Sequence, residues 1–345
     1  MRYFTKMIIL LLLAFNNCFA NNNVVNFYNW AGYIPNSVLK EFTKETGIKI
    51  NFSVFDSNDE LFAKMSASNN HSNYDVIVPS SNFVNRMRMQ GMLEKLDKNK
   101  LSNFKNLNPA LLNKLYDPYN NYSIPYFWGI TGIIVNRYYY PKLKINKWAD
   151  LWNPKLRNQI LMINEMKEPF EIALKVLHLP TNSRDPIQIK QAYEKLLQLL
   201  PNIKLFNITG PQAIFTNGDV GIGVIYNGDA YLAMQDNPNL EFIFPKDGVF
   251  VWTDCMVIPK NAPHLANAYR LINFLLRPDI AAEIAEQAGY SSPNAAALNY
   301  MPKAMRMNPI LYPPQTILDK ANFEYDLGNA EEIYAHYWQL LKLVS

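Results

Sequence analysis

The sequence predicts an α/β fold with two regions, each a mostly parallel sheet flanked by helices. Short apolar runs alternate with helical apolar patterns over residues 24–78, and a second alternating region begins near Gly132. No Gly/Ser-rich linker, internal repeat or low-complexity segment separates the two regions. We therefore expect the chain to pass between them through ordered strands, and ligands to bind at the carboxyl ends of the strands.

The first region follows the order strand, helix, strand, helix, strand, which implies parallel strands joined by helical crossovers. Gly47 is the residue type expected just past the end of the first helix. Ser57 and Glu60 have the spacing of a capping box at the start of the second helix. The strands are predicted over residues 24–28, 49–54 and 74–78.

The second region shows the same alternation over a longer stretch of chain. Pro169 is predicted at the first position of a helix, where its missing N–H is tolerated. The strands are predicted over residues 132–135, 159–163, 221–225 and 240–244. The longer helices are predicted over residues 188–200, 265–276, 280–288 and 330–343.

Composition excludes several classes of protein. Of the 345 residues, 49% are hydrophobic and 18% are charged, which is unlike a disordered chain or a coiled coil. The 33 Lys and Arg residues do not gather into one basic stripe, so no nucleic-acid partner is expected. No metal-ligand spacing, phosphate-binding glycine motif or serine nucleophile elbow occurs, so we expect no metal, no cofactor and no catalytic residue.

Residues 1–20 have the features of a secretory signal peptide. Two basic residues precede a short apolar run over residues 7–15, and Ala20 stands at the expected cleavage point. Cys18 makes a lipoprotein signal the alternative, although the two Asn residues before it fit lipid attachment poorly. Cleavage leaves Cys255, predicted to be buried on a strand, as the one cysteine; this excludes an internal disulfide and favours a periplasmic protein.

Large aromatic and acidic residues stand at the predicted strand ends. If these ends meet in one cleft, the cleft suits an organic polycation, because carboxylates accept hydrogen bonds from ammonium groups and aromatic faces attract cations. Taken singly, each aromatic residue fits a core and each acid fits the surface, so the prediction depends on the whole set. The set comprises Glu165, Glu168, Asp254, Trp30, Tyr226, Trp252 and Tyr290.

Several stretches also resemble one known family. FYNW from Phe27, YDVIVPS from Tyr74, WADLW from Trp148 and LINFLLRPD from Leu271 follow one another along the chain. In these stretches the sequence resembles the bacterial periplasmic spermidine/putrescine-binding proteins, the substrate-binding components of polyamine ABC importers. The resemblance covers nearly the whole chain after residue 20.

The resemblance implies a two-lobed protein whose inter-lobe cleft closes on its ligand, with chain crossings near Gly129 and Thr253. It implies a periplasmic monomer that delivers a polyamine to the membrane permease subunits of an ABC importer with a cytoplasmic ATPase. The first lobe is predicted to contain residues 21–129 and 254–298, and the second lobe residues 130–253 and 299–345.

The resemblance also implies roles for individual residues. Glu165 and Glu168 would hold one ammonium group, and Asp254 would hold the secondary amine or the next ammonium group. The box around the aliphatic chain would consist of Trp30, Tyr226, Trp252 and Tyr290. The remaining ligand contacts would come from Tyr33, Ser80 and Asn82 in the first lobe and from Glu324 at the far end.

Five positions depart from the patterns of these relatives. Tyr226, Glu165, Asn82 and Glu324 stand where Trp, Asp, Tyr and Gln are usual in spermidine-preferring members. Gly32 stands where putrescine-preferring members have Asp, so spermidine is slightly favoured over putrescine. The four acidic residues of the implied site exceed the charge of spermidine, so either one carboxyl is protonated or bridged by a lysine, or the cleft favours a ligand of higher charge. Crowding of like charges raises a carboxyl pKa, which is consistent with partial protonation of the ligand-free site.

Two other functions stay open. A sensor or signalling protein can use the same fold for the same ligand. A carbohydrate-active enzyme is the weaker alternative, because Glu165 and Glu168 are three residues apart at a helix start and face one side of a substrate. The two carboxyl groups of a glycosidase flank the bond that is cleaved.

Overall fold

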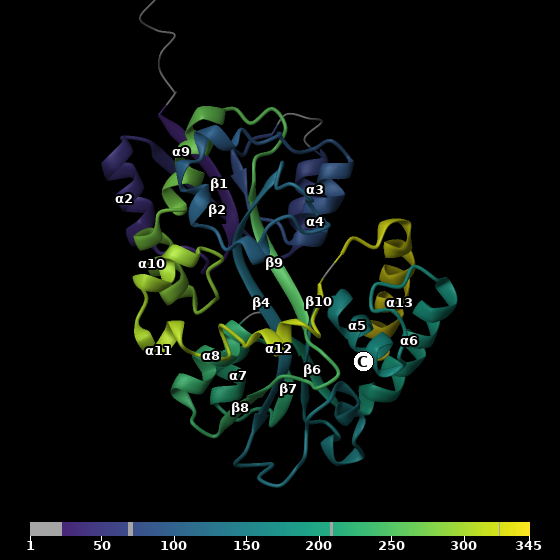
Figure 1. Ribbon diagram of the computed structural model, residues 1–345. Coiled ribbons are helices and arrows are strands. Elements are labelled where there is room, and N and C mark those ends of the chain that lie inside the picture. Colours follow the sequence, from purple (N-terminus) through teal and green to yellow (C-terminus); the bar gives the residue numbers. More distant parts are fainter. Residues whose placement is uncertain (1–22, 68–71, 208–209, 324) are drawn as a thin grey trace, which may run out of the picture.

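The computed structural model describes residues 23–67, 72–207, 210–323 and 325–345, so the predicted signal peptide lies outside the described residues. Figure 1 shows two halves, one above the other, joined by two long strands. We call residues 23–122 and 258–299 the first half, and residues 137–249 and 325–345 the second half. The joining strands are β4 (Ser123–Asn136) and β9 (Phe250–Val257).

The strands of the described residues form one continuous sheet, and each half contributes a group of parallel strands to it. The two parts are joined through β4 and β9, which pair with each other in antiparallel orientation. The short strands β8 (Leu240–Ile243) and β10 (Asn322–Phe323) pair with β4 and β9. The parallel strands are β1 (Val24–Trp30), β2 (Lys49–Phe55) and β3 (Val76–Ile77) in the first half, and β5 (Ile160–Ile163), β6 (Ile203–Asn207) and β7 (Ile222–Tyr226) in the second.

Every residue of β4 and β9 is buried. A strand covered on both faces shows no alternation of apolar and polar residues, which is why the sequence predicted only residues 132–135 of β4. The predicted crossing residues lie within this strand pair, where Gly129 is opposite Trp252 and Trp128 is opposite Thr253. A further segment over residues 300–321, yellow in Figure 1, also leads from the first half to the second. The lobe boundaries themselves stay a prediction.

Helices cover the sheet in both halves. The first half contains α2 (Asn36–Thr46), α3 (Asn58–Ala67), α4 (Ser81–Met89), α9 (Leu265–Leu275) and α10 (Pro278–Ala288). The second half contains α5 (Lys167–Val176), α6 (Pro186–Leu199), α7 (Pro211–Thr216), α8 (Asn227–Asp236) and α13 (Glu331–Leu343). The segment that leads to the second half carries α11 (Lys303–Arg306) and α12 (Gln315–Leu318).

Local helix signals in the sequence were right in part. Gly47 adopts a left-handed conformation with φ of 71° and ends α2, as predicted. Ser57 Oγ accepts the backbone N–H of Glu60 at 3.2 Å, but the Glu60 carboxylate accepts the N–H of Asp56 instead of that of Ser57, so half of the capping box forms. The prediction for Pro169 was wrong by two residues: it is the third residue of α5, a position where a backbone N–H would have no partner within the helix, so the missing N–H of proline costs nothing there.

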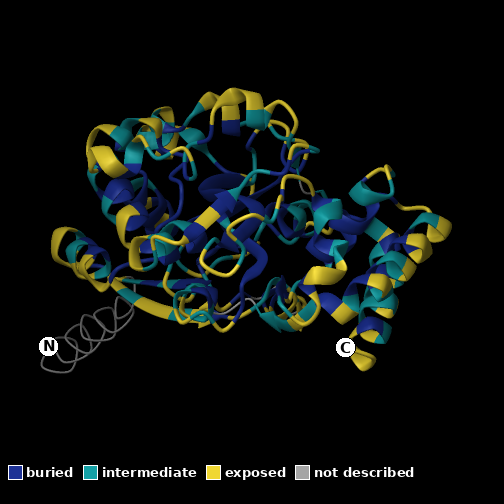
Figure 2. Ribbon diagram, turned by 90° about the horizontal axis from the view of Figure 1, so that it is seen from below, coloured by how far each residue is buried: buried dark blue, intermediate teal, exposed yellow. Residues whose placement is uncertain are grey.

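Each half has its own hydrophobic core, and Figure 2 shows the buried residues of both in dark blue. Phe42 and Ile272 belong to the core of the first half, and Trp148 and Phe170 to that of the second. Cys255 is fully buried in β9 as predicted, and burial raises the pKa of its thiol. No helix in the described part of the chain is both long and apolar enough to cross a bilayer.

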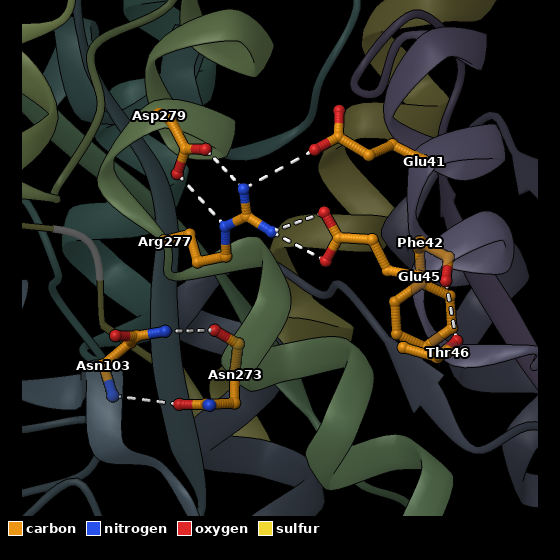
Figure 3. A network of polar contacts seen from close by, with 8 residues as sticks. All are labelled: Glu41, Phe42, Glu45, Thr46, Asn103, Asn273, Arg277 and Asp279. Atoms are coloured by element: carbon orange, nitrogen blue, oxygen red, sulfur yellow. Dashed lines mark hydrogen bonds and ion pairs between the residues drawn. The ribbon is translucent and has the colours of Figure 1, made fainter.

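A network of charged side chains ties α2 to α10 in the first half (Figure 3). The guanidinium of Arg277, which directly precedes α10, lies 2.8 Å from a carboxylate oxygen of Glu45 and 3.5 Å from one of Glu41. It also pairs with Asp279 and lowers the pKa of that carboxyl group. One side chain therefore joins three carboxylates from two helices.

We expect Arg277→Ala to lower the free energy of unfolding by about 1–2 kcal/mol, because a network is worth more than an isolated surface pair. The Arg277 side chain is 30% exposed, and the expected loss of about 1–2 kcal/mol already allows for screening of its charge by solvent. Chemical denaturation measures the change. Lys190→Ala, which removes the exposed pair with Glu194, is the control and should change the free energy by less than about 0.5 kcal/mol. Equal effects of the two substitutions would contradict a stabilising network.

Candidate functional site

A cavity of about 410 Å³ is lined by residues of both halves and of the strand β9 between them. Most of the residues predicted for the site line this one cavity. Glu324 is the exception, because it lies outside the described residues. The predicted residues that line the cavity are Trp30, Tyr33, Ser80, Asn82, Glu165, Glu168, Tyr226, Trp252, Asp254 and Tyr290.

The fold explains why these side chains converge. Trp30 is the last residue of β1, Ser80 directly precedes α4, and Tyr226 is the last residue of β7, so strand ends supply part of the site as predicted. Trp252 and Asp254 were predicted at a strand end, which is wrong: both lie within β9. Because β9 runs from one half to the other, its mid-strand residues reach the cavity without a strand end.

Asp254 accepts a hydrogen bond at each of its carboxylate oxygens. Ser80 Oγ donates to Oδ1 at 2.6 Å, and the hydroxyl of Tyr33 donates to Oδ2 at 2.9 Å. Burial raises the pKa of Asp254 to about 6, although both hydrogen bonds oppose this rise. The two donors hold the carboxylate in one orientation, and each oxygen keeps a further lone pair for a cationic ligand.

Glu165 and Glu168 form a second acidic group at the start of α5. The hydroxyl of Tyr226 donates to Glu168 Oε1 at 2.8 Å, and burial raises the pKa of Glu168. Burial and then the negative charge of Glu168 raise the pKa of Glu165 to about 8. Both shifts favour the neutral carboxyl over the carboxylate in the ligand-free protein. The partial protonation expected from the sequence stays a prediction.

Aromatic rings form the apolar wall of the cavity. The ring of Trp252 lies edge to face with Tyr226 and with Tyr290, at a centroid distance of 5.4 Å in each case. Two glycines make room for these rings. A Cβ at Gly129 would lie 2.2 Å from the Trp252 ring, and a Cβ at Gly228 would lie 2.2 Å from the Tyr290 ring.

Asn82, on the first turn of α4, adds a neutral acceptor to the acidic cavity. Its Oδ1 atom is buried and has no hydrogen-bond partner among the described residues. A buried acceptor without a partner is costly, and an ammonium group in the cavity would satisfy it. Asn82 is thus suited to the first-lobe contact that the sequence predicted.

Sequence reasoning missed Asp229, a further carboxyl group in the cavity wall. Asp229 accepts hydrogen bonds from the Tyr290 hydroxyl at 2.9 Å and from Gln212 Nε2 at 2.8 Å. Burial raises the pKa of Asp229 to about 7. The feature of the sequence that could have identified Asp229 is its position three residues after Tyr226. Because α8 begins at Asn227, the first turn of this helix brings the side chains of Tyr226 and Asp229 to the same cavity.

The site combines acceptors for ammonium groups with rings that pack on methylene groups, which is the chemistry of binding a linear organic cation. Among the described residues that line the cavity, the one lysine is Lys167, which is largely buried: its Nζ donates to the carbonyl of Tyr325 at 2.8 Å and pairs with Glu171. Across the described residues, no group of three or more His, Cys, Asp or Glu is arranged to hold a metal ion.

Comparison with known proteins gives consistent matches along the chain. The profile of the family described as bacterial extracellular solute-binding protein matches residues 37–313. The spermidine/putrescine-binding periplasmic protein of Salmonella typhimurium is 42% identical over 323 residues, which cover 94% of this chain and 92% of that protein. The protein of the same name from Escherichia coli is 41% identical over 322 residues, which cover 93% and 92%.

Among solved structures, the substrate-binding protein of a spermidine/putrescine ABC transporter from Streptococcus pneumoniae superimposes with a TM-score of 0.80 at 32% identity. The match covers 93% of this chain and 99% of that one, so it includes both halves and confirms the two-lobed fold.

Proposed function

The chain belongs to the bacterial extracellular solute-binding proteins, and on this premise we propose that it captures polyamines and delivers them to an ABC importer. The family consists of solute-binding proteins, so the chain is a binding protein and not an enzyme. Relatives at 42% and 41% identity carry spermidine and putrescine in their names, which supports this class of ligand.

The observation that carries the proposal is the meeting of Glu165, Glu168 and Asp254 with Trp252 in one cavity. A polyamine is a chain of methylene groups between ammonium groups, and it needs acids at intervals with apolar surface between them. Charge-assisted hydrogen bonds to carboxylates are about twice as strong as neutral ones. Each aromatic face adds about 0.5–2 kcal/mol for a desolvated cation.

We place one terminal ammonium group between Glu165 and Glu168, and the next amine at Asp254. The methylene groups between them would pack against Trp252 and Tyr226. The other predicted contacts are Tyr290 and Trp30 around the chain, Tyr33, Ser80 and Asn82 from the first lobe, and Glu324 at the far end. Bridging both lobes in this way would favour the closed arrangement.

Spermidine is favoured slightly over putrescine in this proposal. Gly32 lines the cavity but adds no carboxylate to it. A Cβ added at Gly32 would have none of the neighbouring atoms within 4 Å. Glu165, Glu168, Asp229 and Asp254 already surround the cavity, and a trivalent amine compensates more of their charge than a divalent one.

Polyamine affinity should rise with pH. Burial raises the pKa values of Glu165, Asp229 and Asp254 to about 8, 7 and 6, so near pH 6 the free protein holds protons on Glu165 and Asp229 and on part of Asp254. An ammonium ligand favours the carboxylate form, so binding releases protons. We expect affinity at least about tenfold weaker at about pH 6 than at about pH 8.5, because each carboxyl must lose its proton below its own pKa. Calorimetry in buffers of different ionisation enthalpy measures both the affinity and the protons released.

Glu165→Gln is the control for this pH dependence. The amide of Gln does not titrate in this pH range, so the dependence of affinity on pH above about pH 7 should flatten even though overall affinity falls. The same pH profile in the parent protein and in the variant would contradict the role of Glu165.

The proposal extends to location and partners. We propose export through the predicted signal peptide, cleavage after Ala20 and action as a monomer. The names of the relatives place those proteins in the periplasm, which supports export. N-terminal sequencing of the protein recovered from periplasm would test the cleavage point, and light scattering would test the oligomeric state. The partners would be the permease subunits and ATPase of an ABC importer.

A direct test is native mass spectrometry of the purified protein followed by calorimetry with spermidine, putrescine and spermine. We expect a polyamine to be released from the protein and at least one of the three to bind with micromolar or tighter affinity. Absence of binding by all three amines would overturn the proposed function.

A further inference from the structure

Arg86 and Glu331 form an ion pair between the two halves. NH1 of Arg86 lies 2.8 Å from Oε1 of Glu331. Arg86 is on α4 of the first half, and Glu331 is the first residue of α13 in the second half. Every other ion pair of the described residues joins two side chains within one half, so this pair alone connects the halves by charge.

The pair lies beside the acidic end of the main cavity. A small side pocket of about 40 Å³ is lined by Arg86 and Glu331 and shares wall residues with that cavity. The shared residues are Asn82, Phe83, Glu165 and Lys167. Separation of Arg86 from Glu331 would therefore open the structure next to Glu165, where we place one end of the ligand.

Neighbouring groups hold both partners of the pair in place. The guanidinium of Arg86 lies over the ring of Phe62, 3.9 Å from its centroid, which stabilises the cation on the first half. Glu331 is in the first turn of α13, where the helix dipole favours a carboxylate. The two side chains are 30% and 23% exposed, so solvent screens them less than an ordinary surface pair.

The backbone before α13 is also attached to the cavity wall. Lys167 Nζ donates to the carbonyl oxygen of Tyr325 at 2.8 Å, and Lys167 itself is on the first turn of α5. The start of α13 thus has a second attachment within its own half. The Arg86–Glu331 pair therefore joins two elements that each have a further contact within their own half.

We propose that Arg86 and Glu331 form a latch that stabilises the closed arrangement of the two halves and slows release of the ligand. The identity of the released ligand rests on the proposed function, whereas stabilisation of the closed arrangement does not. Arg86 and Glu331 are positioning residues in this proposal, because neither lines the main cavity.

The latch is tested by measuring the distance between the halves. Spin labels on Tyr119→Cys and Ile187→Cys report this distance, since the two residues are 71% and 70% exposed in opposite halves. The native Cys255 is fully buried and does not compete for the label. We expect Arg86→Met and Glu331→Gln each to shift the distribution toward the open arrangement, measured both without ligand and with spermidine. Lys260→Met, which removes a 3.0 Å pair with Glu94 inside the first half, should leave it unchanged.

Release kinetics supply the second readout. Each single substitution should speed spermidine dissociation by about fivefold to tenfold, and the double variant should be no faster than either single one. Distance distributions and release rates equal to those of the parent would overturn the latch. If the parent binds no spermidine, the proposed function fails, and the distances without ligand still decide whether the latch exists.

Discussion

Replacing Asp254 with Asn should weaken spermidine binding by about a hundredfold, because removal of one member of a buried charge pair leaves the other uncompensated. The amide keeps the shape of the side chain, and its oxygen can still accept a hydrogen bond from Ser80 or Tyr33. The negative charge that Asp254 brings to the cavity wall is lost. Calorimetry with spermidine measures the effect.

Stability should change in the opposite direction from affinity. Burial raises the pKa of Asp254 to about 6, so at neutral pH the folded ligand-free protein contains a poorly solvated carboxylate. The sign is that of an acid with a raised pKa: its contribution to the free energy of unfolding decreases as pH rises from about 4 toward 6. Asp254→Asn removes this penalty, and we expect a melting temperature equal to or above that of the parent.

Glu94→Gln is the matched control for Asp254→Asn. Glu94 pairs with Lys260 on the first half and does not line the cavity, so its neutralisation should leave spermidine affinity within about twofold. Affinity of Asp254→Asn within about threefold of the parent would refute the central place of Asp254 in the site.

Replacing Trp252 with Ala should lower spermidine affinity by at least about tenfold, since the ligand loses an aromatic face for its methylene groups and cations. The indole is 6% exposed and packs against Tyr226, Tyr290 and the backbone at Gly129. The vacated space would also cost about 3–5 kcal/mol of folding free energy. Trp252→Phe retains a ring and should recover most of the stability and part of the affinity.

Trp148→Phe separates loss of binding from loss of packing. Trp148 is fully buried in the core of the second half, packs on Phe250 and donates its indole N–H to the carbonyl of Gly248. Its replacement should reduce stability without changing spermidine affinity by more than about twofold. A similar loss of affinity in Trp148→Phe and Trp252→Phe would show that the effect at Trp252 is one of folding.

Much of the secondary structure could be predicted from the chain because the relevant forces are local. The period of apolar residues predicted α2, α6 and α9 within a few residues, and Gly47 ended α2 by its conformational freedom. The helices α4 and α8 were missed. Their sequences begin Ser-Asn and Asn-Gly, which resemble turns, and packing against the sheet makes them helical.

The candidate site could be predicted in its chemistry but not in its geometry. Ten of the predicted side chains share one cavity, yet Trp252 and Asp254 reach it from within a strand and not from a strand end. Asp229 was missed because α8, whose first turn brings it to the cavity, was itself missed.

The sequence by itself determined the alternation of strands and helices, the two α/β regions and the types of side chain that suit a polyamine. These follow from local periodicity and from residue chemistry. Tertiary structure alone decided that β4 and β9 are shared by both halves, that Asp254 faces Ser80 and Tyr33, and that Arg86 meets Glu331. Such contacts join residues up to 245 positions apart, and they form only when the packing of both cores brings distant segments together.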